Sequence, residues 1–177
     1  KRGYRLITSP DLVTAEEVSL YTGKGSFGKK IVYQPSVKST QEIAYSLARD
    51  GAPEGSIVLA DEQTGGRGRL GRAWQSPAGT GIWMSLILRP EIPLQKAPQL
   101  TLLIAVAASK AIEKVTGLEA AIKWPNDLLI NGKKTAGILT ELQAEADSIH
   151  SVIVGIGMNV NQESKHFSEE IAQIATS

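Results

Sequence analysis

The hydrophobic pattern at the start of the chain is short and soon interrupted. Apolar and polar residues alternate across residues 1–9, which predicts a strand. The apolar residues of 10–21 form one side of a short helical turn. The Gly- and Lys-rich residues 23–30 that follow predict a linker and a domain boundary.

Beyond the linker, the pattern predicts a domain that mixes strands and helices. Short apolar runs at 31–33, 57–60 and 82–88 are typical of buried strands. The longest amphipathic stretch, 98–117, predicts a helix that ends at its glycine. The residues of this helix expected to face the core are Leu102, Leu103, Val106, Ala107, Ile112 and Val115.

Another helix is predicted to begin at Ser39. The sequence at 39–42 fits a capping box, in which the Ser39 hydroxyl accepts from the Glu42 amide and the Glu42 side chain reaches back. Gly51 would end this helix, because glycine readily adopts the left-handed conformation found at helix C-termini.

The second half of the chain is rich in predicted strands. Residues 127–130 and 133–142 flank an Asn-Gly dipeptide, the preferred two-residue hairpin turn because both positions take positive φ. Residues 149–160 predict a last long strand, and 168–175 the opening of a helix. Helices combined with antiparallel hairpins favour an α+β fold with a mixed, largely antiparallel sheet over a doubly wound parallel one.

Composition narrows the classes of function. The 177 residues hold 19 Lys plus Arg against 18 Asp plus Glu, so nucleic-acid binding would need a local basic patch. The absence of cysteine excludes disulfides, cysteine zinc sites and thiol nucleophiles. The longest uncharged apolar stretch, residues 97–109, is too short to span a bilayer. Since no signal-peptide core is visible either, we expect a cytoplasmic protein without membrane contacts.

Two glycine-rich segments look like known motifs but fit them poorly. Residues 23–28 match a dinucleotide fingerprint and a kinase glycine-rich loop, yet no helix is expected after them and no kinase catalytic strings follow. Residues 66–69 look like an RGG tract, but they lie between predicted strands rather than in low-complexity sequence. We therefore expect a linker at the first segment and an ordered ligand loop at the second.

The segment richest in chemical groups is 63–74, in which Arg67, Arg69 and Arg72 alternate with glycines. Arginine is a permanently charged donor for phosphate and carboxylate. Glycines let the backbone approach an anion closely and let a loop change shape. A solvated basic surface loop is the alternative interpretation, but such a loop rarely needs so many glycines.

A second segment is Lys123-Trp124-Pro125-Asn126-Asp127. Pro125 keeps Trp124 out of the helical region, and Asn and Asp are common turn residues, so a plain strand–turn–strand connector is one interpretation. An ATP–Mg²⁺ site is the other, because lysine can meet phosphate and aspartate is an oxygen ligand for the metal.

Two further segments place glycines inside predicted strands. Lys133 and Lys134 follow the hairpin turn, and only one of them can face inward because strand residues alternate. An exposed hairpin tip is the alternative for this pair. Gly137 marks close approach by a ligand or another backbone. In residues 155–161, glycines and then asparagines occupy every second position, which suits either a pocket wall or a strand exit.

Taken in order, these four segments closely resemble the motifs of the biotin protein ligase family, the biotin–[acetyl-CoA-carboxylase] ligases. The resemblance covers about residues 31–177 and implies an α+β catalytic domain related to class II aminoacyl-tRNA synthetases. One difference is Gln41, where family members commonly carry asparagine after Ser-Thr. Another is Leu70, where some members have arginine.

The resemblance also implies a reaction in two steps. Biotin and ATP, with Mg²⁺, form biotinyl-5′-AMP, and a lysine of the biotin carboxyl carrier protein of acetyl-CoA carboxylase then takes the biotin. Such a reaction needs positioned cations rather than a protein nucleophile, which agrees with a chain that lacks cysteine. A lipoate or octanoate ligase is one alternative, and a biotin-sensing repressor with little ligase activity is another.

Matching positions imply a role for each motif residue. Biotin is expected at Ser39, Thr40, Gln63, Gly66, Arg67, Lys134 and Gly137. ATP or the adenylate is expected at Arg69, Arg72, Trp74, Lys123, Asn126 and Asn159. The residues expected to act in catalysis are Lys134, Arg67, Arg69 and Asp127, with Asp127 as the Mg²⁺ ligand.

The resemblance divides the chain into two parts. Residues 1–28 resemble the wing of a winged helix-turn-helix DNA-binding domain followed by a linker, and residues 29–177 the catalytic domain. The recognition helix and the SH3-like domain of the family are absent from this sequence, so operator DNA is an expected partner of a longer form only. Family members are often homodimers, and we expect the same here.

Overall fold

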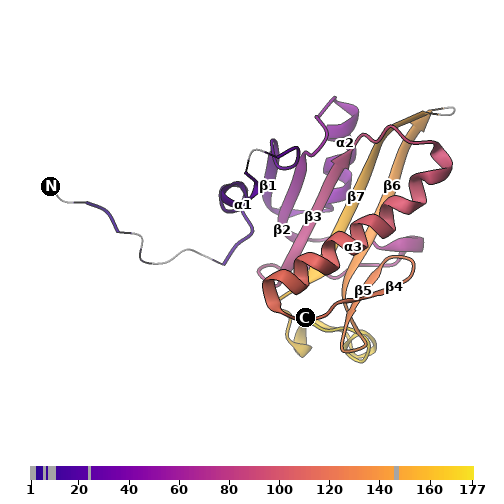
Figure 1. The fold of residues 1–177 in the computed structure, drawn as a ribbon. Coiled ribbons are helices and arrows are strands. Elements are labelled where there is room, and N and C mark those ends of the chain that lie inside the picture. Colours follow the sequence, from indigo (N-terminus) through magenta and orange to yellow (C-terminus); the bar gives the residue numbers. More distant parts are fainter. Residues whose placement is uncertain (1–2, 6, 8–10, 24, 146–147) are drawn as a thin grey trace.

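The computed structural model describes the chain except for residues 1–2, 6, 8–10, 24 and 146–147. Its main body is a seven-stranded sheet with helices on both faces (Figure 1). The strands are β1 (Ile31–Val37), β2 (Ile57–Gln63), β3 (Gly81–Leu88), β4 (Ala121–Lys123), β5 (Asp127–Ile130), β6 (Lys133–Glu145) and β7 (Ser148–Asn159). The helices are α1 (Ala15–Thr22), α2 (Thr40–Arg49), α3 (Ala97–Thr116) and α4 (Glu169–Ala172).

The sheet has the strand order β1-β2-β3-β7-β6-β5-β4. β1 and β2 pair in parallel, and the other neighbouring strands pair antiparallel. The predicted α+β class and the mixed, largely antiparallel sheet are therefore confirmed. β5 and β6 form the predicted hairpin, and both turn residues have positive φ, 50° at Asn131 and 78° at Gly132.

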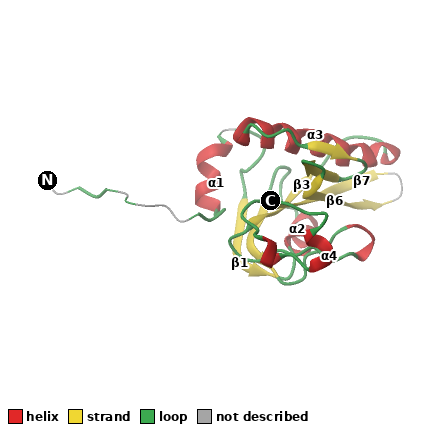
Figure 2. Ribbon diagram, turned by 90° about the horizontal axis from the view of Figure 1, so that it is seen from below, coloured by secondary structure: helices red, strands yellow, loops and turns green. Residues whose placement is uncertain are grey.

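Strand residues alternate between two apolar cores, one on each face of the sheet. In β2, Ile57 and Leu59 belong to the core that includes α3, whereas Val58 belongs to the core that includes α2. β3 and β7 follow the same alternation. Figure 2 shows the result, with α3 over one face of the sheet and α2 over the other.

α3 presents a different face to the core from the one predicted. Ile112 is buried as expected, but Leu103 and Val115 are 62% and 83% exposed, and Val106 and Ala107 are also exposed. The inward stripe consists of Leu100, Ile104, Ala105, Ala108 and Ile112. The prediction was wrong because apolar residues surround most of this helix, so periodicity does not single out one face. No helix in the described part of the chain is long and apolar enough to cross a membrane.

The N-terminal segment packs partly against the main body. Val13 and Val18, before and within α1, contact the core on the α3 face of the sheet. The strand predicted across residues 1–9 is not formed at residues 3–5 and 7, the described part of that segment, and the rest of the prediction lies outside the described residues. A strand needs a partner for its backbone hydrogen bonds, and alternation alone does not supply one.

Candidate active site

A cavity of about 430 Å³ lies beside the N-terminus of α2 and over the middle of the sheet. β3, β6 and β7 contribute to it, together with the loop 67–75 and the C-terminal residues 162–175. Its size is in the range of small-molecule sites. Apart from Gly66, every residue that the sequence assigned to biotin, ATP or catalysis lines this cavity.

One end of the cavity is polar and closely hydrogen-bonded. The side-chain oxygen of Gln63 accepts from the Thr40 amide at 2.9 Å and lies 3.1 Å from the Thr40 hydroxyl. The Gln63 side-chain nitrogen donates to Ser76 Oγ at 2.9 Å. These contacts fix the end of β2 against the start of α2, so Thr40 and Gln63 meet although 23 positions separate them.

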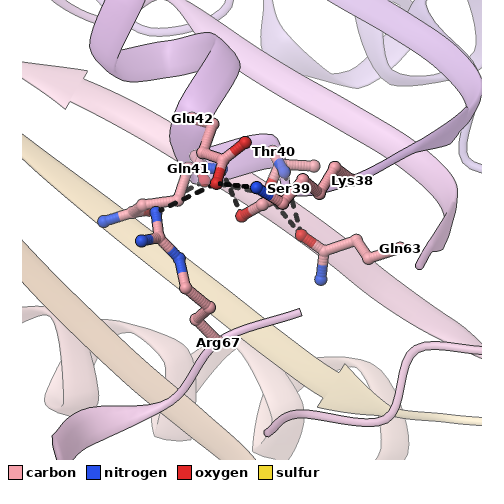
Figure 3. A network of polar contacts seen from close by, with 8 residues as sticks. Lys38, Ser39, Thr40, Gln41, Glu42, Gln63 and Arg67 are labelled. Carbon is pink, nitrogen blue, oxygen red and sulfur yellow. Dashed lines mark hydrogen bonds and ion pairs between the residues drawn. The ribbon is translucent and has the colours of Figure 1, made fainter. Parts of the chain in front are cut away.

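Ser39 caps α2, but not through the predicted capping box. Its hydroxyl accepts from the Gln41 amide at 3.3 Å rather than from Glu42. The Glu42 carboxylate instead lies between two cations, 3.2 Å from Lys38 Nζ and 3.8 Å from Arg67 Nη2 (Figure 3). Charged partners attract a carboxylate more strongly than a neutral amide does. Glu42 therefore holds Arg67 beside the cavity.

The loop 67–75, which we call the arginine loop, is ordered as predicted and is not a low-complexity tract. Arg67 and Ala73 face each other in an antiparallel bridge, and the Trp74 amide donates to Gly66 O at 2.9 Å. A side chain at Gly66 would overlap the Trp74 carbonyl oxygen, so this close approach requires glycine. The loop thereby brings three arginines to the cavity: Arg67, Arg69 and Arg72.

Lys134 is the inward-facing member of the lysine pair. Its ammonium lies 2.7 Å from Asp127 Oδ1 and 5.2 Å from the centre of the Trp74 ring. Lys133 is exposed and does not line the cavity. An anion that enters the cavity would therefore meet an ammonium group already held in place by a carboxylate and an aromatic face.

Two glycines make room for Trp74 on the sheet. Gly137 of β6 and Gly157 of β7 are direct partners in the ladder. A Cβ atom at Gly157 would lie 2.5 Å from Trp74 Cε2, and one at Gly137 would lie 2.9 Å from Trp74 Cζ3. The glycines of these strands therefore form a pocket wall, the first of the two interpretations offered by the sequence.

Asn126 closes the turn between β4 and β5. Its side-chain nitrogen donates to Ile138 O at 3.0 Å, and its backbone carbonyl accepts from the Ile138 amide at 2.9 Å. Its side-chain oxygen accepts from Arg69 Nη1 at 3.5 Å. Asn126 is thus both a turn residue and a contact for an arginine of the cavity, while Lys123 lines the same side.

The C-terminal segment contributes contacts that sequence reasoning missed. The Lys134 amide donates to Ile174 O at 2.7 Å, and Lys134 O accepts from the Thr176 amide at 2.8 Å. Asn159 is held by the same segment, because its side-chain nitrogen donates to Thr176 O at 3.0 Å and its oxygen accepts from Gln162 at 3.2 Å. The apolar lining residues that this segment contributes are Phe167, Ile171, Ile174 and Ala175. The sequence predicted only the opening of a helix over residues 168–175, and α4 forms there without having been assigned to the site.

The donor set does not fit a metal site held by the protein alone. Within the described ranges, no three His, Cys, Asp or Glu side chains gather closely enough to hold a metal ion. Asp127 is the one carboxylate among the described residues that line the cavity, and it is paired with Lys134. Mg²⁺ usually needs one or two carboxylates together with substrate phosphates and waters.

Comparison with known proteins identifies relatives of the whole chain. The family model of the biotin/lipoate A/B protein ligases matches residues 33–159. The bifunctional ligase/repressor BirA of Bacillus spizizenii is 56% identical over 177 residues, which is 100% of this chain and 54% of that protein. BirA of Escherichia coli is 32% identical over 160 residues, 90% of this chain and 48% of that protein. The chain thus spans about half the length of the curated relatives it matches.

One solved structure has the same fold as most of this chain. The biotin protein ligase from Aquifex aeolicus in complex with biotin and ATP superposes with a TM-score of 0.69 at 39% sequence identity. The match covers 84% of this chain and 59% of that one.

Proposed function

This chain belongs to the biotin/lipoate A/B protein ligase family, and from that premise we propose that it activates biotin with ATP and transfers it to a protein lysine. In the first step the biotin carboxylate attacks the α-phosphorus of ATP, which forms biotinyl-5′-AMP and releases pyrophosphate. In the second, a lysine amine of a biotin carboxyl carrier protein attacks the acyl carbon and AMP leaves. One observation carries the proposal: a single cavity joins a polar end to a cationic end.

The polar end suits the ureido ring of biotin. Ser39 and Thr40 are 2% and 3% exposed, and their hydroxyls can each accept or donate. An unpaired polar group at such a depth costs about 1–3 kcal/mol, so a ligand with matching N–H and C=O groups is favoured. The dithiolane ring of lipoate has neither group. This supports biotin over the lipoate alternative.

The cationic end suits the carboxylate of biotin and the α-phosphate of ATP. Lys134 and Arg67 line this end, and Asp127 is the group that Lys134 would exchange for an incoming anion. Gly66 brings the loop close to the cavity, and Gly137 leaves space next to Lys134, whose Cε would lie 3.4 Å from an added Cβ. In this proposal the protein orients two reactants and neutralises developing charge.

The nucleotide is assigned to the side of the cavity nearest the arginine loop and the β4–β5 turn. Its adenine would meet Trp74 and Asn159, since an aromatic face suits stacking. The residues assigned to the phosphates and ribose are Arg69, Arg72, Lys123 and Asn126. Asp127 is paired with Lys134, and its role as a Mg²⁺ ligand stays a prediction. Neither step of the proposed reaction depends on that role.

Further partners follow from the relatives named ligase/repressor. We propose that a protein in which this chain is joined to a DNA-binding domain would bind operator DNA. The wing remnant at 1–28, the homodimer and the cytoplasmic location stay predictions.

Mass spectrometry of a carrier domain tests the substrate. After incubation with this chain, ATP and biotin, the carrier is expected to gain the mass of one biotinyl group at a single lysine. Lipoate in place of biotin, or omission of ATP, should leave the carrier unmodified. Modification by lipoate at the same rate would favour the lipoate ligase instead.

A further inference from the structure

Glu42 lies in the first turn of α2, and its carboxylate faces two cations (Figure 3). One oxygen, Oε1, lies 3.2 Å from Lys38 Nζ and 3.8 Å from Arg67 Nη2. Arg67 lines the cavity, whereas Glu42 is not one of the described residues that do. Any effect of Glu42 on a ligand in the cavity is therefore exerted through Arg67 or through its charge.

The Arg67 side chain depends on Glu42 for its placement. The backbone of Arg67 is fixed by the bridge with Ala73. Its guanidinium, however, has Glu42 as its one ion-pair partner in the described part of the chain. An arginine side chain has many rotamers, and a ligand that orders them loses affinity. A carboxylate that orders the guanidinium beforehand removes part of that cost.

Lys38 competes for the same carboxylate oxygen. It lies one helical turn from Glu42 and approaches Oε1 more closely than Arg67 does. Because both cations use this oxygen, removal of Lys38 would leave it free for Arg67.

These three side chains face solvent at the edge of the cavity. The side chains of Lys38, Arg67 and Glu42 are 73%, 46% and 38% exposed. Water and salt screen charges at such positions. We therefore expect the effect of Glu42 on the placement of Arg67 to exceed its direct repulsion of an anionic ligand.

We infer that Glu42 is a positioning residue that holds Arg67 where its guanidinium meets the carboxylate of biotin, and that Lys38 limits how firmly Glu42 holds it. The inference rests on the proposed function, because it concerns the cationic end of the same cavity. Glu42 acts through Arg67 and touches neither biotin nor ATP.

Equilibrium binding to the 177-residue chain without ATP tests this inference. Titration calorimetry would compare biotin with biotinol, in which an uncharged alcohol replaces the carboxylate. The unmodified chain should bind biotin about tenfold or more tightly than biotinol, because biotinol lacks the charge-assisted contact. Glu42→Gln should lower this preference by about two- to fivefold, the effect of one exposed ion pair. A role in helix stability alone would weaken both ligands equally and leave the preference unchanged.

Lys38→Met is the matched control, and it separates positioning from simple charge. If only nearby charge mattered, Glu42→Gln would remove a negative charge and strengthen the preference for biotin, and Lys38→Met would weaken it. Positioning predicts the reverse order. Lys38→Met should keep the preference or raise it, since Glu42 is then free to hold Arg67.

A double variant shows whether Glu42 acts through Arg67. Arg67→Met should lower the preference for biotin by itself. Addition of Glu42→Gln should then lower it no further, because no guanidinium is left to position.

The outcomes separate the two proposals. Failure of the unmodified chain to bind biotin would overturn the proposed function. This inference alone would be overturned by biotin binding no tighter than biotinol, or by a preference that survives Glu42→Gln. A loss of preference in Lys38→Met, or a further loss when Glu42→Gln is added to Arg67→Met, would overturn it as well.

Discussion

Among single residues, Lys134 has the contacts expected of a group that receives an anion. It is partly buried, paired with Asp127 at 2.7 Å, and placed over Trp74. An ion pair of this kind holds the ammonium in place until an anionic ligand competes for it. Its neighbour Lys133 has the same charge but faces solvent.

Lys134→Met is expected to lower the rate of biotin-dependent adenylate formation by about a hundredfold or more, the typical effect of removing one charge-stabilising donor. Lys133→Met is the matched control and should keep the rate. Single-turnover formation of biotinyl-5′-AMP measures both variants. An equal loss of rate in both variants would show that adenylate formation does not depend specifically on Lys134.

Gly157→Ala is expected to weaken nucleotide use, because the added Cβ would lie 2.5 Å from Trp74 Cε2 and push the indole off the sheet. The KM for ATP should rise severalfold, about 1 kcal/mol of lost contact. Gly25→Ala, whose added Cβ would have only an ordinary contact of 3.6 Å, is the control. An unchanged KM in Gly157→Ala would argue against Trp74 as a nucleotide contact.

Single residues of the site differ in how well the sequence alone predicts them. Lys134 and Arg67 lie in short motifs, so the resemblance to the family identified them. The hydrogen bonds of Gln41 were not predictable in this way, because its partners Ser85 and Ile153 are 44 and 112 positions away and are brought to it only by folding.

At the scale of elements, the start of α2 is where the site is assembled. Ser39 caps the helix, Thr40 binds Gln63, and Glu42 holds Arg67. The capping serine was predictable, since serine before a helical pattern is a local signal. The partner of Glu42 was not, because Arg67 reaches it from a loop distant in the sequence.

Ser39→Ala is expected to lower the free energy of unfolding by about 1 kcal/mol through loss of the helix cap. Ser39→Asn restores a capping oxygen and should recover most of that loss. Urea unfolding followed by circular dichroism measures both. Equal stability of Ser39→Ala and the unmodified chain would show that the cap at 3.3 Å contributes nothing.

In the whole molecule, the main body and α1 share one apolar core. Val13 and Val18 contact the cluster on the α3 face of the sheet, although the sequence placed them in a separate N-terminal part. The apolar periodicity predicted the helix α1 but not the core that it packs against. The inward face of α3 was missed for the same reason, because an apolar residue does not reveal its packing partner.

Val18→Ala is expected to lower the free energy of unfolding by about 1 kcal/mol in a single cooperative transition, because two methyl groups leave the shared core. Leu20→Ala, at a side chain that is 75% exposed, should change it by less than about 0.5 kcal/mol. Thermal and urea unfolding of both variants provide the comparison. If Val18→Ala left stability unchanged, α1 would not be part of the folding unit.

The central claim is that one cavity activates biotin as an adenylate. Exchange of labelled pyrophosphate into ATP measures this step directly, without a carrier protein. Label should enter ATP when biotin is present, and not when biotin is omitted or replaced by lipoate. A folded chain that shows no biotin-dependent exchange would contradict it.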